Sequence, residues 1–127
     1  MVTKAKAFPP PANVYARDCP SRVVLDHVTS RWAVLVLIVL SRGTHRFSEL
    51  RREVTGVSEK MLSQTLRDLE HDGFVHREAF AEVPPRVEYC LTPLGEGVAE
   101  KVSALVIWIE GSLPDVMRAR AKRPTAS

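Results

Sequence analysis

The apolar positions in the first third of the chain recur at intervals that favour helices. A first helix is predicted to begin at Pro20, because the N–H that proline lacks would have no partner in the first turn. Its apolar stripe is formed by Val24, Leu25 and Val28. Residues 33–40 are apolar on every side and rich in β-branched side chains, which also fits a buried strand. The Ser41-Arg42-Gly43 segment that follows is typical of a helix end, so we predict a second, fully covered helix.

The next segment has the pattern of two short amphipathic helices. Phe47, Leu50 and Val54 are spaced i, i+3 and i+7, with charged residues between them. The pattern breaks at 55–57, and Ser58 is a good N-cap for a second helix that ends at Gly73. The apolar stripe of this second helix is Leu62, Leu66 and Leu69. Two helices joined by a tight turn that contains glycine form a helix-turn-helix unit.

After Gly73 the spacing changes from helical to alternating. Residues 74–80 and 86–91 flank a proline-containing turn at 83–85, and every other residue of the second run is apolar, as in a half-buried strand. Thr92-Pro93 then provides an N-cap and a first-turn proline for a long helix. The apolar stripe of that helix is Val98, Val102, Leu105 and Ile109. The order of elements predicts a mainly helical α+β fold, a winged helix-turn-helix with a two-stranded β-hairpin wing.

The second helix of the helix-turn-helix unit presents polar groups on the side opposite its leucines. The outward residues are Lys60, Ser63, Gln64 and Arg67, which follow the N-cap Ser58. Gln can contact adenine and Arg can contact guanine through paired hydrogen bonds, while Ser and Lys can hold phosphate. Arg77 and Arg86 of the hairpin are placed to meet the DNA backbone. On an isolated helix these side chains would more simply form a solvated face, but the turn before it and the hairpin after it favour duplex DNA binding.

Composition and charge narrow the class of protein. The chain has 127 residues, enough for one domain without disulfides or metal, and a net charge of +3 that permits an anionic partner. Its longest apolar run, 32–40, is less than half of the ~20 residues of a membrane span. The start of the chain lacks the apolar stretch of a signal peptide, so we expect a cytoplasmic protein with no membrane partner. No cofactor, metal site or enzyme motif is predicted.

The domain organisation follows from these patterns. Residues 1–15 contain a proline triplet and no periodicity, so a flexible arm is predicted there. Residues 16–113 are predicted to form the DNA-binding and dimerisation domain, and residues 114–127 a basic, frayed tail. A domain this small does not cover the whole stripe of its last helix, so we expect a homodimer. The predicted dimer contacts are Val24, Val98, Val102, Leu105, Trp108 and Ile109.

Segments along residues 19–97 resemble the HxlR family of bacterial winged-helix regulators. The matching segments are Cys19-Pro20, Leu25-Asp26, Arg31-Trp32, 35–40, Arg46-Phe47-Ser48-Glu49-Leu50, Val57-Ser58-Glu59-Lys60-Met61-Leu62, 66–69, Asp72-Gly73, Val83-Pro84-Pro85-Arg86-Val87-Glu88-Tyr89 and Leu91-Thr92-Pro93-Leu94-Gly95. The resemblance implies a homodimer that binds an operator as repressor or activator. In some members it also implies a redox or electrophile sensor at the cysteine before proline. Arg31 departs from the pattern, since a glycine-lysine pair commonly precedes the tryptophan.

Cys19 is the candidate sensor in this chain. It would lie at the positive N-terminus of the first helix with Arg17 and Arg22 nearby, and both effects favour the reactive thiolate. A thiol without any sensing role fits the sequence equally well. Cys90, in a predicted strand, lacks comparable activation. Two alternatives to an oxidant-responsive regulator stay open: control by a non-covalent small-molecule effector, and a partner-binding module that does not bind DNA.

Overall fold

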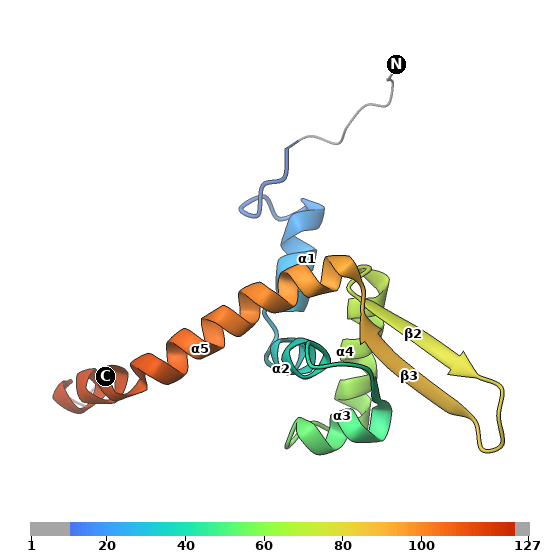
Figure 1. Ribbon diagram of the computed structural model, residues 1–127. Helices are drawn as coiled ribbons and strands as arrows, with labels where there is room; N and C mark the ends of the chain where they lie inside the picture. Colours follow the sequence, from blue (N-terminus) through green and yellow to red (C-terminus); the bar gives the residue numbers. More distant parts are fainter. Residues whose placement is uncertain (1–10, 124–127) are drawn as a thin grey trace.

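The computed structural model describes residues 11–123, so most of the predicted arm and the last four residues of the predicted tail lie outside it. The first three helices are α1 (Pro20–Val28), α2 (Arg31–Leu40) and α3 (Phe47–Glu53). Helix α4 (Glu59–His71) follows, then the strands β2 (Val75–Phe80) and β3 (Arg86–Leu91), and finally α5 (Pro93–Lys122). Figure 1 shows the β2–β3 hairpin projecting on one side of the body and the C-terminal part of α5 on the other.

Helix α2 is the centre of the core, and its helical form confirms one of two open readings of the sequence. The Ser30 hydroxyl accepts a hydrogen bond from the Ala33 N–H at 3.2 Å, which caps the helix. Val36 and Leu37 are fully buried, and α2 packs against α3, α4, α5 and β3. A helix covered on most of its sides is apolar nearly all round, which explains why its sequence also fits a strand. The predicted full cover is wrong at Leu35, which is exposed.

The predicted hairpin forms with β2 and β3 antiparallel, from Val75 opposite Leu91 to Phe80 opposite Arg86. A further strand, β1 (His45–Arg46), pairs with the other edge of β3, so the sheet order is β1-β3-β2. Its two residues are too few to show an alternating pattern, and for that reason the sequence does not reveal it. Because β1 leads directly into α3, it ties the helix-turn-helix unit to the base of the wing.

The predicted helix ends around the hairpin are confirmed. Gly73 follows α4 with φ of +84°, a conformation that glycine adopts without the steric cost of a side chain. The Thr92 hydroxyl accepts from the Gly95 N–H at 3.0 Å and donates to the Gly73 carbonyl at 2.6 Å. One side chain therefore caps α5 and also holds its first turn against the end of α4.

Helix α5 is longer than the sequence suggests. It continues through residues expected to form a frayed tail and ends at Lys122, with Pro114 inside it. Most of the residues after Pro114 are good helix formers, and an ion pair between Asp115 and Arg118 joins successive turns.

Within residues 11–123, no single helix is long and apolar enough to cross a membrane. Helices α1 and α2 reach that length and apolar composition only when they are taken together, and the pair is bent by 72°.

Candidate nucleic-acid interface

Helix α4 is fixed in the molecule by its N-cap and its apolar face. The Ser58 hydroxyl accepts a hydrogen bond from the Met61 N–H at 3.1 Å, as the sequence predicts for an N-cap. Leu62, Leu66 and Leu69 are buried, which confirms the predicted inward stripe. The opposite face is consequently held toward solvent in one orientation.

The outward face of α4 carries a chain of hydrogen bonds. Lys60, Gln64 and Arg67 are exposed and Ser63 is half-buried. The Arg67 guanidinium donates to Gln64 Oε1 at 3.0 Å, and the Gln64 amide donates to Asp68 Oδ1 at 2.9 Å. The two groups suited to base contacts are therefore aligned along the helix, with a carboxylate at the end of the row.

A groove of about 400 Å³ lies between α4 and the wing. Arg67 from α4 and Arg77 from β2 both line it, together with Ser63, Leu66, Glu70 and Tyr89. The structure thus brings one predicted wing residue to the predicted DNA-contacting face of α4. Glu70 partly offsets the positive charge of the two arginines.

The second predicted wing residue, Arg86, lies on the other face of the hairpin. Its guanidinium is 2.9 Å from Glu82 and 3.5 Å from Glu88, and it stacks over the Phe80 ring at 4.2 Å. Alternation along β3 places Tyr89, which pairs with Arg77, on the opposite face. In the free protein the charge of Arg86 is directed at wing carboxylates, and its contact with phosphate stays a prediction.

Further cationic side chains lie near the proposed DNA-contacting face, at positions that the sequence did not single out. Arg46, the residue before α3, and Arg52 within it are exposed. Arg51 instead reaches across the turn to Glu59 at 3.2 Å. A groove of about 320 Å³ separates the start of α3 from the wing, lined by Arg46, Phe47, Ser48, Pro85, Arg86 and Val87. Their proximity depends on β1 pairing with β3, for which the sequence has no signal.

A helix-turn-helix with an adjacent wing is also what the comparisons indicate. A family model described as HxlR-like helix-turn-helix matches residues 27–117. The chain belongs to this family. It is 62% identical over 111 residues to YtfH of Escherichia coli strain K12, which is described as an HTH-type transcriptional regulator. The matched residues cover 87% of this chain and 88% of YtfH. A solved structure of ytfH from Salmonella typhimurium has a TM-score of 0.85 at 59% identity, covering 88% of this chain and all of that one.

A more distant solved structure is that of the redox regulator HypR in its oxidized form. It has a TM-score of 0.67 at 38% identity and covers 73% of this chain and 96% of that one. These findings confirm the resemblance and the winged-helix fold. The protein is an HTH-type transcriptional regulator of the HxlR family and not an enzyme.

Cys19 occupies the predicted place in this HxlR-family chain, immediately before the first turn of α1. Its sulfur accepts hydrogen bonds from the Ser21 hydroxyl at 3.2 Å and from the Asn13 N–H at 3.3 Å. The bond from Ser21, and then that from Asn13, lower the pKa of the Cys19 thiol from its ordinary value. The sequence predicts activation by the helix N-terminus and by Arg17 and Arg22. The structure places Cys19 at the N-cap, and the groups that lower its pKa are hydrogen-bond donors close along the chain.

The apolar stripe of α5 divides into two parts. Val102 is buried and Val98 is half-buried against the body, as is Val24 of α1. Beyond Ser103 most of the large apolar side chains are exposed, including three that the sequence placed at a dimer contact: Leu105, Trp108 and Ile109. The exposed surface extends further than the sequence prediction, to Ile107, Leu113, Val116 and Met117.

Proposed function

We propose that this HxlR-family regulator binds an inverted-repeat operator as a homodimer, with α4 in the major groove and the wing beside it. The observation that carries the proposal is the outward face of α4, where Lys60, Gln64 and Arg67 are exposed and Arg67 lines a groove together with Arg77 of the wing. Ser58 and Ser63 add hydroxyls at the start and middle of the same helix. Paired recognition helices of such dimers contact half-sites roughly 34 Å apart. Because chromosomal DNA of bacteria lies in the cytoplasm, we expect this regulator to act there.

The homodimer is supported by the exposed apolar length of α5. Trp108 is 63% exposed and Ile107 is 69% exposed, and both lie where the helix has left the body of the protomer. Large contiguous apolar surfaces of this kind mark contact sites in proteins. A two-fold partner would cover the same surface on both copies.

Substitutions on α4 test the DNA contacts. Gln64→Ala or Arg67→Ala should weaken operator binding by roughly 1–3 kcal/mol and relax base preference, because each removes a bidentate contact. Lys60→Ala should weaken binding to all duplexes and reduce its salt dependence, since it removes a phosphate contact. Lys101→Ala, which removes the same charge from α5, is the matched control. A triple variant combines Lys60→Ala, Gln64→Ala and Arg67→Ala. If it bound the operator as tightly as wild type, the proposal would be contradicted, and a module that does not bind DNA would be favoured.

We also propose that oxidants control this regulator through Cys19. Its accepted hydrogen bonds stabilise the thiolate, and the structural relative HypR is described as a redox regulator. The thiolate attacks one oxygen of hydrogen peroxide and the O–O bond breaks, so that a sulfenic acid forms and hydroxide leaves to take up a proton. Peroxide should change operator affinity several-fold, reversibly with thiol, and Cys19→Ser should abolish the change. Cys90→Ser is the control.

A non-covalent effector is the second candidate for control. A groove of about 580 Å³ lies between the end of α2, β3 and α5, lined by Leu40, Ser41, Arg42, Gly43, Thr44, Cys90, Leu91, Glu96, Ala99, Glu100 and Ser103. It is large enough for a small molecule and it adjoins the base of the wing. Unchanged DNA affinity after complete modification of Cys19 would favour this candidate.

A further inference from the structure

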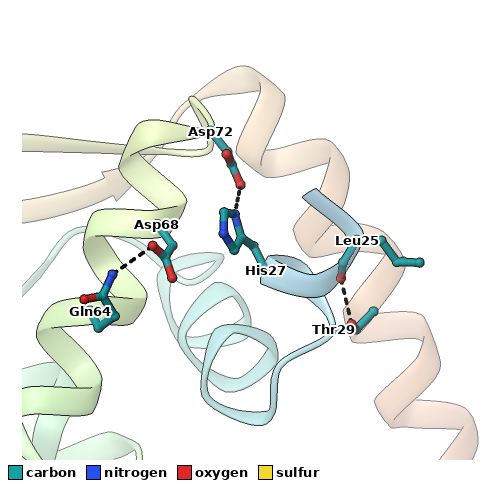
Figure 2. Close-up of polar contacts among 6 residues, drawn as sticks. All are labelled: Leu25, His27, Thr29, Gln64, Asp68 and Asp72. Carbon is teal, nitrogen blue, oxygen red and sulfur yellow. Dashed lines mark hydrogen bonds and ion pairs between the residues drawn. The ribbon is translucent and has the colours of Figure 1, made fainter. Parts of the chain in front are cut away.

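A histidine on α1 is paired with a carboxylate at the end of α4. His27 Nδ1 lies 2.6 Å from Asp72 Oδ2, and Figure 2 shows the two side chains facing each other from these elements. The side chain of Asp72 is only 9% exposed and that of His27 is 23% exposed. Asp72 is also the C-cap residue of α4, so the pair attaches α1 to the last turn of the helix proposed to enter the major groove.

The surroundings of His27 favour its charged form. The hydrogen bond with Asp72 raises the pKa of His27 above its ordinary value, and the carboxylates of Asp68 and Asp26 act in the same direction, against a smaller opposing effect of burial. These acids come from α4 and from α1 itself. Helix α2, which also packs against α1, carries one charged residue, Arg31, and it is exposed. A charged imidazole therefore neutralises a local excess of carboxylates where α1 meets α4.

The carboxylates near His27 are continuous with the face of α4 that carries the base-contacting groups. Asp68 accepts from the Gln64 amide, and Gln64 accepts from Arg67. Figure 2 shows Asp68 one turn before Asp72 on α4, with its bond to Gln64 drawn. Removing the proton from His27 leaves both carboxylates uncompensated at this end of the helix, where their charge repels DNA phosphate.

We propose that protonated His27 is a positioning residue for DNA binding: through Asp72 it holds the last turn of α4 against α1, and loss of the proton weakens operator binding. The inference rests on the proposed function of α4. The direction of the pKa shift fixes how the pair's contribution to stability depends on pH. The contribution of the pair is complete below about pH 6.5, the ordinary histidine pKa, and is lost as pH rises through the higher value in the folded protein.

The wing provides a matched control for this pair. His76 Nε2 lies 2.8 Å from Glu78 Oε1, but both side chains are more than half exposed and both belong to β2. This second pair has the same chemistry and joins no two elements. Substitution of His76 should leave the position of α4 unchanged.

The test measures operator affinity by fluorescence anisotropy from about pH 5.5 to about pH 8.5, at constant ionic strength, for wild type, His27→Gln and His76→Gln. Wild-type affinity should fall several-fold with rising pH, up to about tenfold for each unit by which the pKa of His27 is higher in the DNA complex than in the free protein. His27→Gln, which keeps a hydrogen-bond donor for Asp72, should lose this component, and His76→Gln should retain it. A His27→Gln variant with the wild-type pH profile would overturn the proposal.

A second measurement separates positioning from simple stabilisation and from failure of DNA binding. Because His71 lies in the last turn of α4, the comparison is made in a His71→Gln background. Backbone amide shifts of that turn should follow the protonation of His27 when His27 is present, and should stay constant in the His27→Gln/His71→Gln double variant. A variant that only melts at a lower temperature, with an unchanged pH profile of binding, would show a structural role and contradict the proposal. If wild type bound no duplex at any pH, the proposed function would fail. The amide titration would then decide the positioning of α4 by itself, and static shifts would overturn it.

Discussion

The exposed apolar surface of α5 supports a quantitative prediction about assembly. Ile109 and Leu113 lie one turn apart on the part of α5 that has left the body of the protomer, and they are 44% and 47% exposed. Replacing both with glutamate introduces two carboxylates per protomer into the proposed dimer contact. In a two-fold dimer the same change occurs on both sides of the interface.

The magnitude follows from the surface that these side chains still expose. Burying a complete Leu or Ile side chain stabilises by roughly 1.5–3 kcal/mol, so covering the remaining half contributes about 1 kcal/mol for each side chain. Four side chains across the dimer therefore contribute about 4 kcal/mol. At about 1.4 kcal/mol for each factor of ten, the dimer dissociation constant should rise roughly a thousandfold. Desolvation of the new carboxylates adds to this cost.

Sedimentation velocity over a range of micromolar concentrations measures the effect. Wild type should sediment as a dimer and Ile109→Glu/Leu113→Glu as a monomer with weak operator binding. The control for assembly is Ala79→Glu, which is exposed on strand β2 of the wing and adds a carboxylate away from α5. A double variant that remains dimeric, or a wild type that sediments as a monomer, would show that another surface or no surface forms the dimer.

Three further predictions concern stability. Ser58→Ala should lower the free energy of unfolding by about 0.5–2 kcal/mol in urea titrations, because α4 loses the acceptor for its first turn; an unchanged midpoint would remove Ser58 as a cap. Gly95→Ala should lower the melting temperature, because a Cβ would collide with the Phe74 carbonyl and overpacking costs about 1–3 kcal/mol. Wild-type melting behaviour would contradict that close approach. His27→Gln should be less stable than wild type at about pH 6, and the difference should shrink by about pH 8.5 as wild type loses its proton; a difference independent of pH would contradict the ion pair.

Local sequence determined much of this protein because its signals lie within a few residues of one another. The leucines of α4, its cap at Ser58 and the stop at Gly73 lie within one short stretch and need no distant partner. The Thr92-Pro93 start of α5 has the same character. The outward face of α4 follows from the inward one by helical geometry alone. For these reasons the winged helix-turn-helix and the outward residues of α4 were predictable.

Tertiary structure decided the features that join segments far apart in sequence. Strand β1 exists only because His45 and Arg46 meet β3. His27 and Asp72 are 45 residues apart and meet only when α1 packs on α4. Periodicity and capping report a residue's own helix or strand. The approach of two charged side chains from different elements depends on how the whole core packs, which no local pattern records.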